Sequence, residues 1–378
     1  MTLKFVLAPD SFKGSASAKE ICEAMEKGIR RVFPKSTVQH VPMADGGEGS
    51  TEAVVDATGG EYIQKVVHGP LEEKVEATFG IHGDGKTAVI EMAEASGIQL
   101  LTPEERNPLY TTSYGTGELI RHCLDEGMKN IILCIGGSAT NDGGVGMAQA
   151  LGYQFKDKDG NEIRRGGKYL KDIASIDTSN VHEHLASCEV LVASDVDNPL
   201  TGPEGAAAVF GPQKGATPEM VEDLDEGLKH LEKMIEKKLG KSVGHIPGAG
   251  AAGGLGAGLL AFTEAKLERG VEIIVEATRL KEKVKAADVV FTGEGQIDFQ
   301  TKYGKTPMGV VTAVKEVNEK AKVIAISGSI GEDVETLYDL GFDGIFGTIA
   351  SPGELDKVLK NTLENVSRVT EAVCRTLK

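Results

Sequence analysis

The segment 130–146, NIILCIGGSATNDGGVG, carries the residue types best suited to chemistry in this chain. The apolar run Ile131–Ile135 predicts a strand buried on both faces, a glycine-rich loop follows at 136–144, and 145–151 is typical of a helix. Glycines let backbone N–H groups approach a ligand, and the N-terminus of a helix favours an anion. The loop also offers hydroxyls, an amide and a carboxylate for phosphate oxygens and an accompanying metal. We interpret it as a loop that handles phosphoryl groups.

Polar loops containing glycine and acidic residues follow three other predicted strands. They are PDSFKGS (9–15), ADGGEGS (44–50) and TGEGQID (292–298). Three further loops of similar composition are SDVDNPLTG (194–202), FGPQKG (210–215) and GAGAAGGLG (248–256). Ligands of parallel α/β sheets bind at the carboxyl ends of strands, so we expect these loops to face one cleft.

The strands and helices predicted around these loops indicate an α/β fold. The first 60 residues run twice through strand, polar glycine loop and helix, with strands at 3–8 and 38–43 and helices at 18–33 and 52–58. The same pattern resumes at residue 287, with strands at 288–291, 322–326 and 344–349 and a C-terminal helix at 355–377. We therefore expect a Rossmann-like, parallel, doubly wound sheet domain made of residues 1–66 and 285–378, with a second, mixed α/β domain inserted at 67–284.

The predicted insert begins differently. Three β-branched runs, 62–67, 75–82 and 87–92, are separated by Gly-Pro and Gly-Asp-Gly and predict hairpins. Further along, a buried strand is expected at 189–193. Helices are expected at 114–127, 218–239 and 259–267.

Two motif matches fail on their context. Residues 80–87 fit the P-loop pattern, but that mechanism needs a helix at the lysine, and a strand-like run follows instead, so we predict a hairpin turn. Residues 248–253 fit the dinucleotide fingerprint, but no convincing strand precedes them, a proline lies at the junction, and no strand-borne acidic residue is expected at the required distance within a βαβ unit. Contact between residues 248–253 and phosphate is an alternative that the sequence leaves open, whereas a nicotinamide dinucleotide site is not expected.

Length, composition and charge limit the number of domains and the kinds of partner that we expect. A chain of 378 residues predicts two domains, and its 48 glycines exceed the roughly 7% background. A net charge of −16 without a basic block argues against nucleic acid and membrane partners. The five cysteines show no paired spacing and are expected to be reduced. Without a signal peptide or an apolar run near 18 residues, a cytoplasmic location is expected.

Taken in their order and spacing, the loops resemble those of the bacterial glycerate kinase family. The resemblance runs from Val6 into the C-terminal helix; each motif is short, but their joint order is specific. It implies ATP-dependent phosphorylation of D-glycerate, most often to 2-phosphoglycerate, in a cleft between two domains. Reasoning from the residues supports a phosphotransferase without supplying the substrate. It leaves open a kinase of another small hydroxy or sugar acid, a non-catalytic phosphometabolite sensor, and a homodimer as the assembly.

Phosphoryl transfer needs amide-rich loops, carboxylates for Mg²⁺, a cation and a carboxylate near the attacking hydroxyl. The candidate catalytic residues are Lys13, Asp45, Asp195 and Asp197. The candidate nucleotide-binding residues are Gly137, Ser138, Thr140, Asn141, Gly143, Lys214, Gly253 and Gly254. The candidate substrate-binding residues are Asp10, Ser11, Lys13, Glu294, Gln296 and Asp298. The candidate metal ligands are Asp142 and Asp195.

Each candidate has a structural alternative. At Asp45 and in the loop 138–141 the alternative to a functional role is helix capping. At Asp195 and Asp197 the alternative is an Asx turn. A solvated surface lysine is the alternative at Lys13 and Lys214. The general base stays open among four carboxylates, those of Asp10, Asp45, Asp195 and Asp197.

Overall fold

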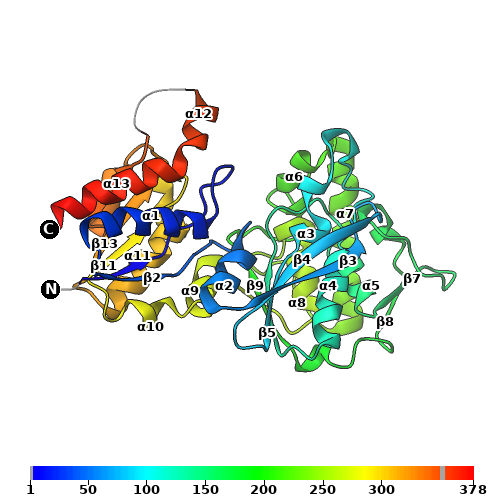
Figure 1. The fold of residues 1–378 in the computed structure, drawn as a ribbon. Helices are drawn as coiled ribbons and strands as arrows, with labels where there is room; N and C mark the ends of the chain where they lie inside the picture. Colours follow the sequence, from blue (N-terminus) through cyan, green and yellow to red (C-terminus); the bar gives the residue numbers. More distant parts are fainter. Residues whose placement is uncertain (1–2, 350–353) are drawn as a thin grey trace. The chain divides into compact units, whose positions relative to one another are not determined.

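The structure is a computed structural model that describes residues 3–349 and 354–378, and it divides into two compact units (Figure 1). Unit 1 consists of Met1–Asp45, Glu52–Gly60 and Arg269–Lys378, and unit 2 of Gly46–Thr51 and Glu61–Glu268. The chain passes between the two units at residues 60/61 and 268/269, earlier in the sequence than the predicted domain boundaries at 66/67 and 284/285. The physical reason is that β3 (Glu61–His68) pairs with β4 (Lys74–Ile81) in unit 2, while residues 270–284 form helices that pack on a unit 1 helix.

Unit 1 contains a five-stranded sheet, parallel throughout, in the order β15–β13–β11–β1–β2. Its strands are β1 (Lys4–Leu7), β2 (Thr37–His40), β11 (Val289–Thr292), β13 (Lys322–Ser327) and β15 (Gly344–Gly347). Numbered along the chain within this sheet, the order is 2-1-3-4-5, that of a doubly wound sheet whose switch point lies between β1 and β11. The predicted Rossmann-like sheet is confirmed.

Helices cover both faces of this sheet. On one face α1 (Ala18–Val32) and α13 (Thr362–Thr376) lie side by side (Figure 1) and share a core with Phe5, Leu7 and Phe291. Because strand side chains alternate, their buried neighbours Val6 and Val290 face the opposite side. There α11 (Thr306–Val317) packs on β11 and β13, next to α9 (Gly270–Ala277) and α10 (Leu280–Val284).

The predicted single C-terminal helix is wrong in one respect, because the segment forms two helices. These are α12 (Leu355–Lys360) and α13, separated at Asn361. Asparagine favours helix ends, since its side chain competes for backbone hydrogen bonds, and here its Nδ2 donates to the carbonyl of Lys357. The break brings Thr362 to the hydroxyl of Ser15 in the loop after β1.

Unit 2 is built on a six-stranded mixed sheet in the order β10–β9–β6–β5–β4–β3. The other strands are β5 (Thr87–Glu91), β6 (Asn130–Cys134), β9 (Glu189–Ala193) and β10 (Lys266–Glu268). Strands β5, β6, β9 and β10 are parallel, and β3 to β5 are antiparallel as the hairpin pattern predicts. The P-loop match is the turn between β4 and β5, in which Asp84 Oδ1 accepts from the backbone of Lys86 and Thr87. Its interpretation as a hairpin is confirmed.

The helices of unit 2 share one hydrophobic core with this sheet. They are α3 (Ala93–Ser96), α4 (Tyr114–Asp125), α5 (Val145–Ala150), α6 (Ala206–Phe210), α7 (Pro218–Leu239) and α8 (Ala251–Phe262), with α2 (Ser50–Thr58) running from unit 2 into unit 1. A small two-stranded antiparallel sheet of β7 (Gln154–Lys156) and β8 (Ser175–Asp177) was not predicted. The helix predicted at 259–267 is wrong beyond Phe262. Thr263 adopts an extended backbone, and Leu267 then packs on the core within β10.

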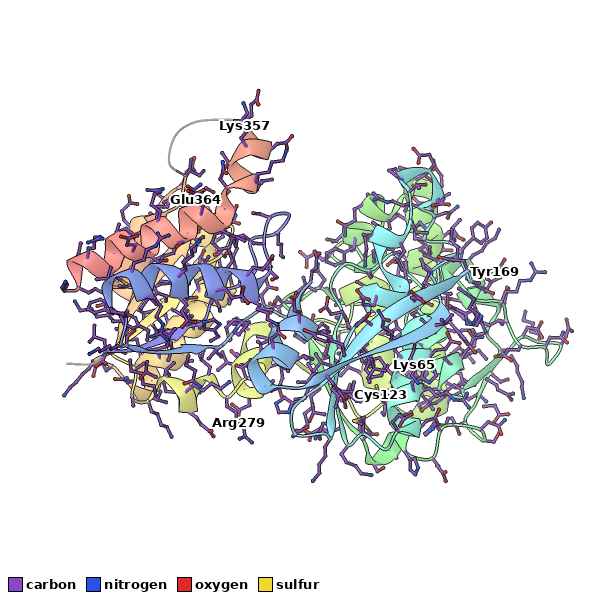
Figure 2. All side chains as sticks on the ribbon, viewed as in Figure 1. Lys65, Cys123, Tyr169, Arg279, Lys357 and Glu364 are labelled. Carbon is purple, nitrogen blue, oxygen red and sulfur yellow. The ribbon has the colours of Figure 1, made fainter. Side chains whose placement is uncertain are left out.

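Two further expectations concern surface and redox chemistry. All five cysteines are free and buried, including Cys123, labelled in Figure 2. In the described part of the chain, no helix has the length and apolar character needed to cross a membrane.

Gly28 lies where α1 packs directly against the backbone of α13. A Cβ built on it would lie 2.4 Å from the carbonyl oxygen of Ser367 in α13. Alanine would favour the helix by about 1 kcal/mol, but overpacking costs about 1–3 kcal/mol, and here the obstacle is backbone. We expect Gly28→Ala to lower the free energy of unfolding measured by urea denaturation, whereas Lys27→Ala, at the exposed neighbouring position, should not. An unchanged or higher value for Gly28→Ala would show that the two helices can separate freely.

Candidate active site

A pocket of about 420 Å³ lies in unit 1, formed by the loops that follow β1, β2, β11 and β13. These loops leave the carboxyl edge of the sheet around its switch point, where doubly wound proteins bind ligands. The charged residues that line the pocket are Asp10, Lys13, Asp45, Glu294 and Lys305. Three segments far apart in sequence therefore contribute a carboxylate each to one cavity.

Asp10 is the most buried of these carboxylates. Its Oδ2 accepts from the hydroxyl of Thr306 at 2.5 Å, and its Oδ1 accepts from the backbone N–H of Ser11 at 2.6 Å. Burial, and then the nearby charge of Asp45, raise the pKa of Asp10 to about 6. Because both oxygens are engaged, Asp10 is held in one orientation in the lining of the pocket.

Glu294 is the second titrating group. Its Oε1 accepts from the Thr301 hydroxyl at 2.9 Å, and its Oε2 lies 3.5 Å from Lys305 Nζ. Burial raises the pKa of Glu294 to about 7 although Lys305 opposes the shift. Carboxylates with pKa values moved toward neutrality in one pocket are typical of functional sites.

Two lysines supply positive charge to the pocket. Lys13 is exposed in the loop between β1 and α1, and Lys305 is half-buried at the start of α11. Sequence reasoning missed Lys305 and Thr306. The available signal was Pro307, since proline in the first helical turn indicates a helix that begins just after the TGEGQID loop.

The structure brings together all but one of the predicted substrate-binding residues. Those lining the pocket are Asp10, Ser11, Lys13, Glu294 and Gln296. Asp298 instead caps a 3₁₀-helix, Phe299–Tyr303, through the backbone N–H of Gln300, and its Oδ2 accepts from Gln296 Nε2 at 3.2 Å. Asp298 therefore orients Gln296 and is not itself part of the pocket lining.

In unit 2 the predicted nucleotide-binding residues form one cluster. Lys214 is buried, and its Nζ donates to Ser138 Oγ at 2.6 Å and to the carbonyl of Thr140 at 2.7 Å. The N–H of Gly143 donates to the carbonyl of Gly253 at 3.1 Å. Burial lowers the pKa of Lys214 to about 7, against the opposing effect of Asp142. The lysine is thus not a solvated surface residue.

The same cluster contains buried polar atoms that lack partners. Thr140 Oγ1 and both Oδ1 and Nδ2 of Asn141 form no hydrogen bond with the residues that the structure describes, although both side chains are fully buried. Each such group costs about 1–3 kcal/mol. Buried groups of this kind call for a ligand, an ion or a water as the missing partner.

Asp142 takes a role other than the predicted one. It is buried, and its carboxylate accepts from the backbone N–H groups of Ser113 at 2.8 Å, Gly144 at 3.1 Å and Gly146 at 3.3 Å. The hydroxyls of Thr112 and Ser113 donate to it as well. With both oxygens committed to protein donors, Asp142 ties the glycine loop to the start of α4, and we do not retain it as a metal ligand.

This role predicts a stability effect for Asp142→Asn. The amide can replace only one oxygen, and its NH₂ group would face N–H donors, so buried donors lose their acceptor. We expect the free energy of unfolding to fall by about 2–3 kcal/mol. Thermal and urea unfolding will measure this, with Asp159→Asn in the exposed β7–β8 turn as the control. Equal stability of the two variants would mean that Asp142 does not hold the loop.

Asp195 and Asp197 are exposed on the loop after β9, on either side of the partly buried Val196. Neither carboxylate is enclosed in the manner of Asp142. Across residues 3–349 and 354–378, no group of three His, Cys, Asp or Glu side chains is arranged to hold a metal ion. A metal that arrives with nucleotide phosphates needs only one or two protein carboxylates, which exposed aspartates can supply.

A parallel sheet with a titratable, lysine-bearing pocket at its switch point defines an α/β enzyme acting on small molecules. Residues 5–378 match the model of the glycerate kinase family. The chain is 50% identical over 375 residues to glycerate kinase of Haemophilus influenzae, and the match covers 99% of each chain. It is 48% identical over 375 residues to glycerate 2-kinase of Escherichia coli, and that match covers 99% of this chain and 98% of the relative. It superposes with a TM-score of 0.92 and 49% identity on a crystal structure assigned to glycerate kinase 2 of Salmonella typhimurium LT2, with 100% of this chain and 98% of that chain covered. The chain belongs to the glycerate kinase family and is a kinase.

Proposed function

We propose that the chain transfers the γ-phosphoryl group of ATP to a hydroxyl of D-glycerate, with 2-phosphoglycerate favoured over 3-phosphoglycerate as the product. Relatives with about half of their residues identical carry the names glycerate kinase and glycerate 2-kinase. The observation that carries the proposal is the gathering of three carboxylates and two lysines in the pocket of unit 1. This combination matches a small substrate that has one carboxylate and two hydroxyls.

In this proposal the lysines bind the carboxylate of glycerate and the acids orient its hydroxyls. Asp10 is held by Thr306 and Ser11, so it acts as a fixed acceptor. Asp45 is only partly buried and is the carboxylate we assign as general base among the four that sequence reasoning left open. A base in contact with the attacking hydroxyl contributes about 10²–10⁴-fold to the rate.

We further propose that the glycine loop of unit 2 binds the nucleotide phosphates. Its glycines expose backbone N–H groups, and Ser138, Thr140, Asn141 and Lys214 add side-chain partners. Asn141 and Thr140 have the unsatisfied polar atoms that such a ligand would engage. Mg²⁺, when bound with ATP, neutralises phosphate charge, and the exposed Asp195 is the carboxylate we retain to hold it.

An assay of ADP release with ATP, MgCl₂ and D-glycerate tests the function. We expect ADP to form only with glycerate, and phosphorus NMR to identify 2-phosphoglycerate. D-lactate and 3-hydroxypropionate each keep one of the two hydroxyls, so turnover of the former alone would confirm the regiochemistry. No glycerate-dependent ADP would end the proposal, and faster turnover of another hydroxy or sugar acid would replace the substrate.

A further inference from the structure

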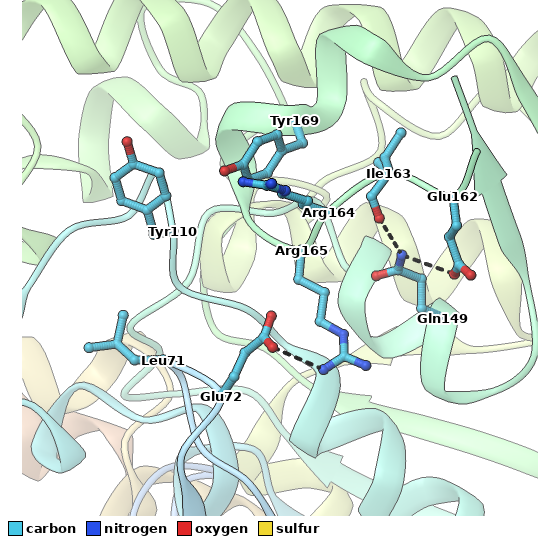
Figure 3. Close-up of a pocket in the computed structure, with 9 residues that line it drawn as sticks. All are labelled: Leu71, Glu72, Tyr110, Gln149, Glu162, Ile163, Arg164, Arg165 and Tyr169. Carbon is cyan, nitrogen blue, oxygen red and sulfur yellow. Dashed lines mark hydrogen bonds and ion pairs between the residues drawn. The ribbon is translucent and has the colours of Figure 1, made fainter. Parts of the chain in front are cut away.

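A second pocket, of about 590 Å³, lies within unit 2 (Figure 3) and includes none of the residues assigned above. The segment before α4 contributes Tyr110, the end of α5 contributes Gln149, and the chain leading from the β7 turn contributes 162–165. Tyr169 completes one side and lies at the surface of unit 2 (Figure 2). The lining is mainly polar and includes two arginines.

Two of the four charged residues in this pocket form an ion pair with each other. Arg165 points to Glu72, with 3.5 Å between Nη1 and Oε2 (Figure 3). Its guanidinium also stacks on the ring of Tyr114, 3.3 Å from the ring centroid. Arg164 is exposed and forms no hydrogen bond or ion pair within the described part of the chain. Its guanidinium is therefore the group available to an anion, and its fork of donors suits a carboxylate or a phosphate.

Gln149 supplies a hydrogen-bond acceptor. Its Nε2 donates to Glu162 Oε1 at 3.3 Å and to the carbonyl of Ile163 at 3.4 Å, which fixes the orientation of the amide (Figure 3). Its Oε1 is then left buried without a hydrogen bond from any described residue. A ligand hydroxyl would satisfy this oxygen, because a hydroxyl can donate where an anion alone cannot.

We propose that this pocket binds a small hydroxylated anion, such as a sugar acid or a sugar phosphate. The anionic group pairs with Arg164, a hydroxyl donates to Gln149 Oε1, and the rings of Tyr110 and Tyr169 cover the carbon skeleton. Lys168 supports this arrangement by donating to the Tyr110 hydroxyl at 3.1 Å. Glu162 offers a further acceptor for hydroxyls, which is the composition expected for a polyol rather than a bare anion.

The pocket shares two supports with the glycine loop. Thr111, next to Tyr110, donates from Oγ1 to the carbonyl of Ala139 at 2.8 Å. Gln149 lies on α5, the six-residue helix that begins directly after the loop. A ligand that immobilises Tyr110 and Gln149 therefore restrains residues 139–146. The pocket is in this sense an effector site, and neither its binding nor this restraint depends on the proposed kinase reaction.

Isothermal titration calorimetry of the full chain tests the proposal. The probes are D-gluconate and D-glucose 6-phosphate, which separate carboxylate from phosphate recognition, with inorganic phosphate and D-glucose as references. We expect at least one probe to bind more tightly than both references, and Arg164→Gln to weaken that binding about tenfold or more. Lys158→Gln removes an equal charge from the exposed β7–β8 turn and should leave the affinity unchanged.

Gln149→Met provides a second, nearly isosteric variant that removes the buried acceptor. It should weaken the binding of the hydroxylated probe but not of inorganic phosphate. Hydrogen exchange in residues 139–146 should slow when the probe binds to the wild type and not in Arg164→Gln. The proposal is overturned if neither probe binds, if Arg164→Gln retains full affinity, or if inorganic phosphate binds as tightly as the probes. Binding without altered exchange would leave a binding site and remove its effector role.

Discussion

Asp45→Asn is expected to lower the turnover number with D-glycerate by about 10²- to 10⁴-fold. Asp45 follows β2 and lines the same pocket as Asp10 and Glu294. Asp10 has both oxygens engaged and is 6% exposed, whereas Asp45 keeps partial exposure toward the pocket. Asparagine keeps the size of the side chain and its hydrogen-bonding capacity but cannot take the proton of the attacking hydroxyl.

The split between turnover and binding makes this prediction specific. The affinity for D-glycerate, measured by calorimetry, should change by much less than kcat, because the lysines and Asp10 remain. Asp339→Asn, at an exposed position of the same unit, should affect neither quantity. If Asp45→Asn instead raises the dissociation constant and leaves kcat intact, Asp45 is a binding residue, and the general base must be sought at Asp195 or Asp197.

The sheet of unit 1 could be predicted because its signals are local. Strands β1, β11 and β13 are short, mainly apolar runs, and each is followed by the glycine and acidic residues of a loop. Parallel topology then places those loops at one edge, so that Asp10, Lys13 and Glu294 reach one pocket without any knowledge of side-chain packing. The hairpin at 80–87 was predictable for the same reason, since turn chemistry is set within a few residues.

What the sequence could not show are contacts between distant segments. Thr306 fixes Asp10 across 296 positions of the chain, and Lys214 reaches Ser138 across 76. The burial of Asp142 has the same origin, because its donors at 112–113 belong to a different segment. In the sequence, a polar residue that binds a ligand from a glycine loop cannot be distinguished from one that fixes the conformation of that loop. Only the positions of its partners separate the two roles.

Glu294→Gln is expected to make the protein more stable at pH 8 and less active. Glu294 has a pKa of about 7 against an ordinary value of 4.5, chiefly because it is buried. The folded state therefore binds this proton more tightly than the unfolded chain. Its contribution to stability is full below about pH 4.5 and is lost as the pH rises through about 7. At pH 8 the wild type holds a buried, ionised carboxylate that glutamine would replace with a neutral group, a gain of about 1–3 kcal/mol.

The pH dependence separates this explanation from a simple packing effect. The stability difference between Glu294→Gln and the wild type should vanish near pH 4, where both side chains are neutral, and Glu335→Gln at an exposed position should show no difference at either pH. Activity should decrease where stability increases, and we expect kcat of the variant to be about 10²-fold lower than that of the wild type. We also expect kcat of the wild type to fall as the pH drops below 7. Lower stability of Glu294→Gln at pH 8 would mean that the 3.5 Å pairing with Lys305 outweighs burial, and that Glu294 is a structural ion pair. Higher stability with lower activity would instead show that the fold tolerates an unfavourable charge here because the pocket requires it.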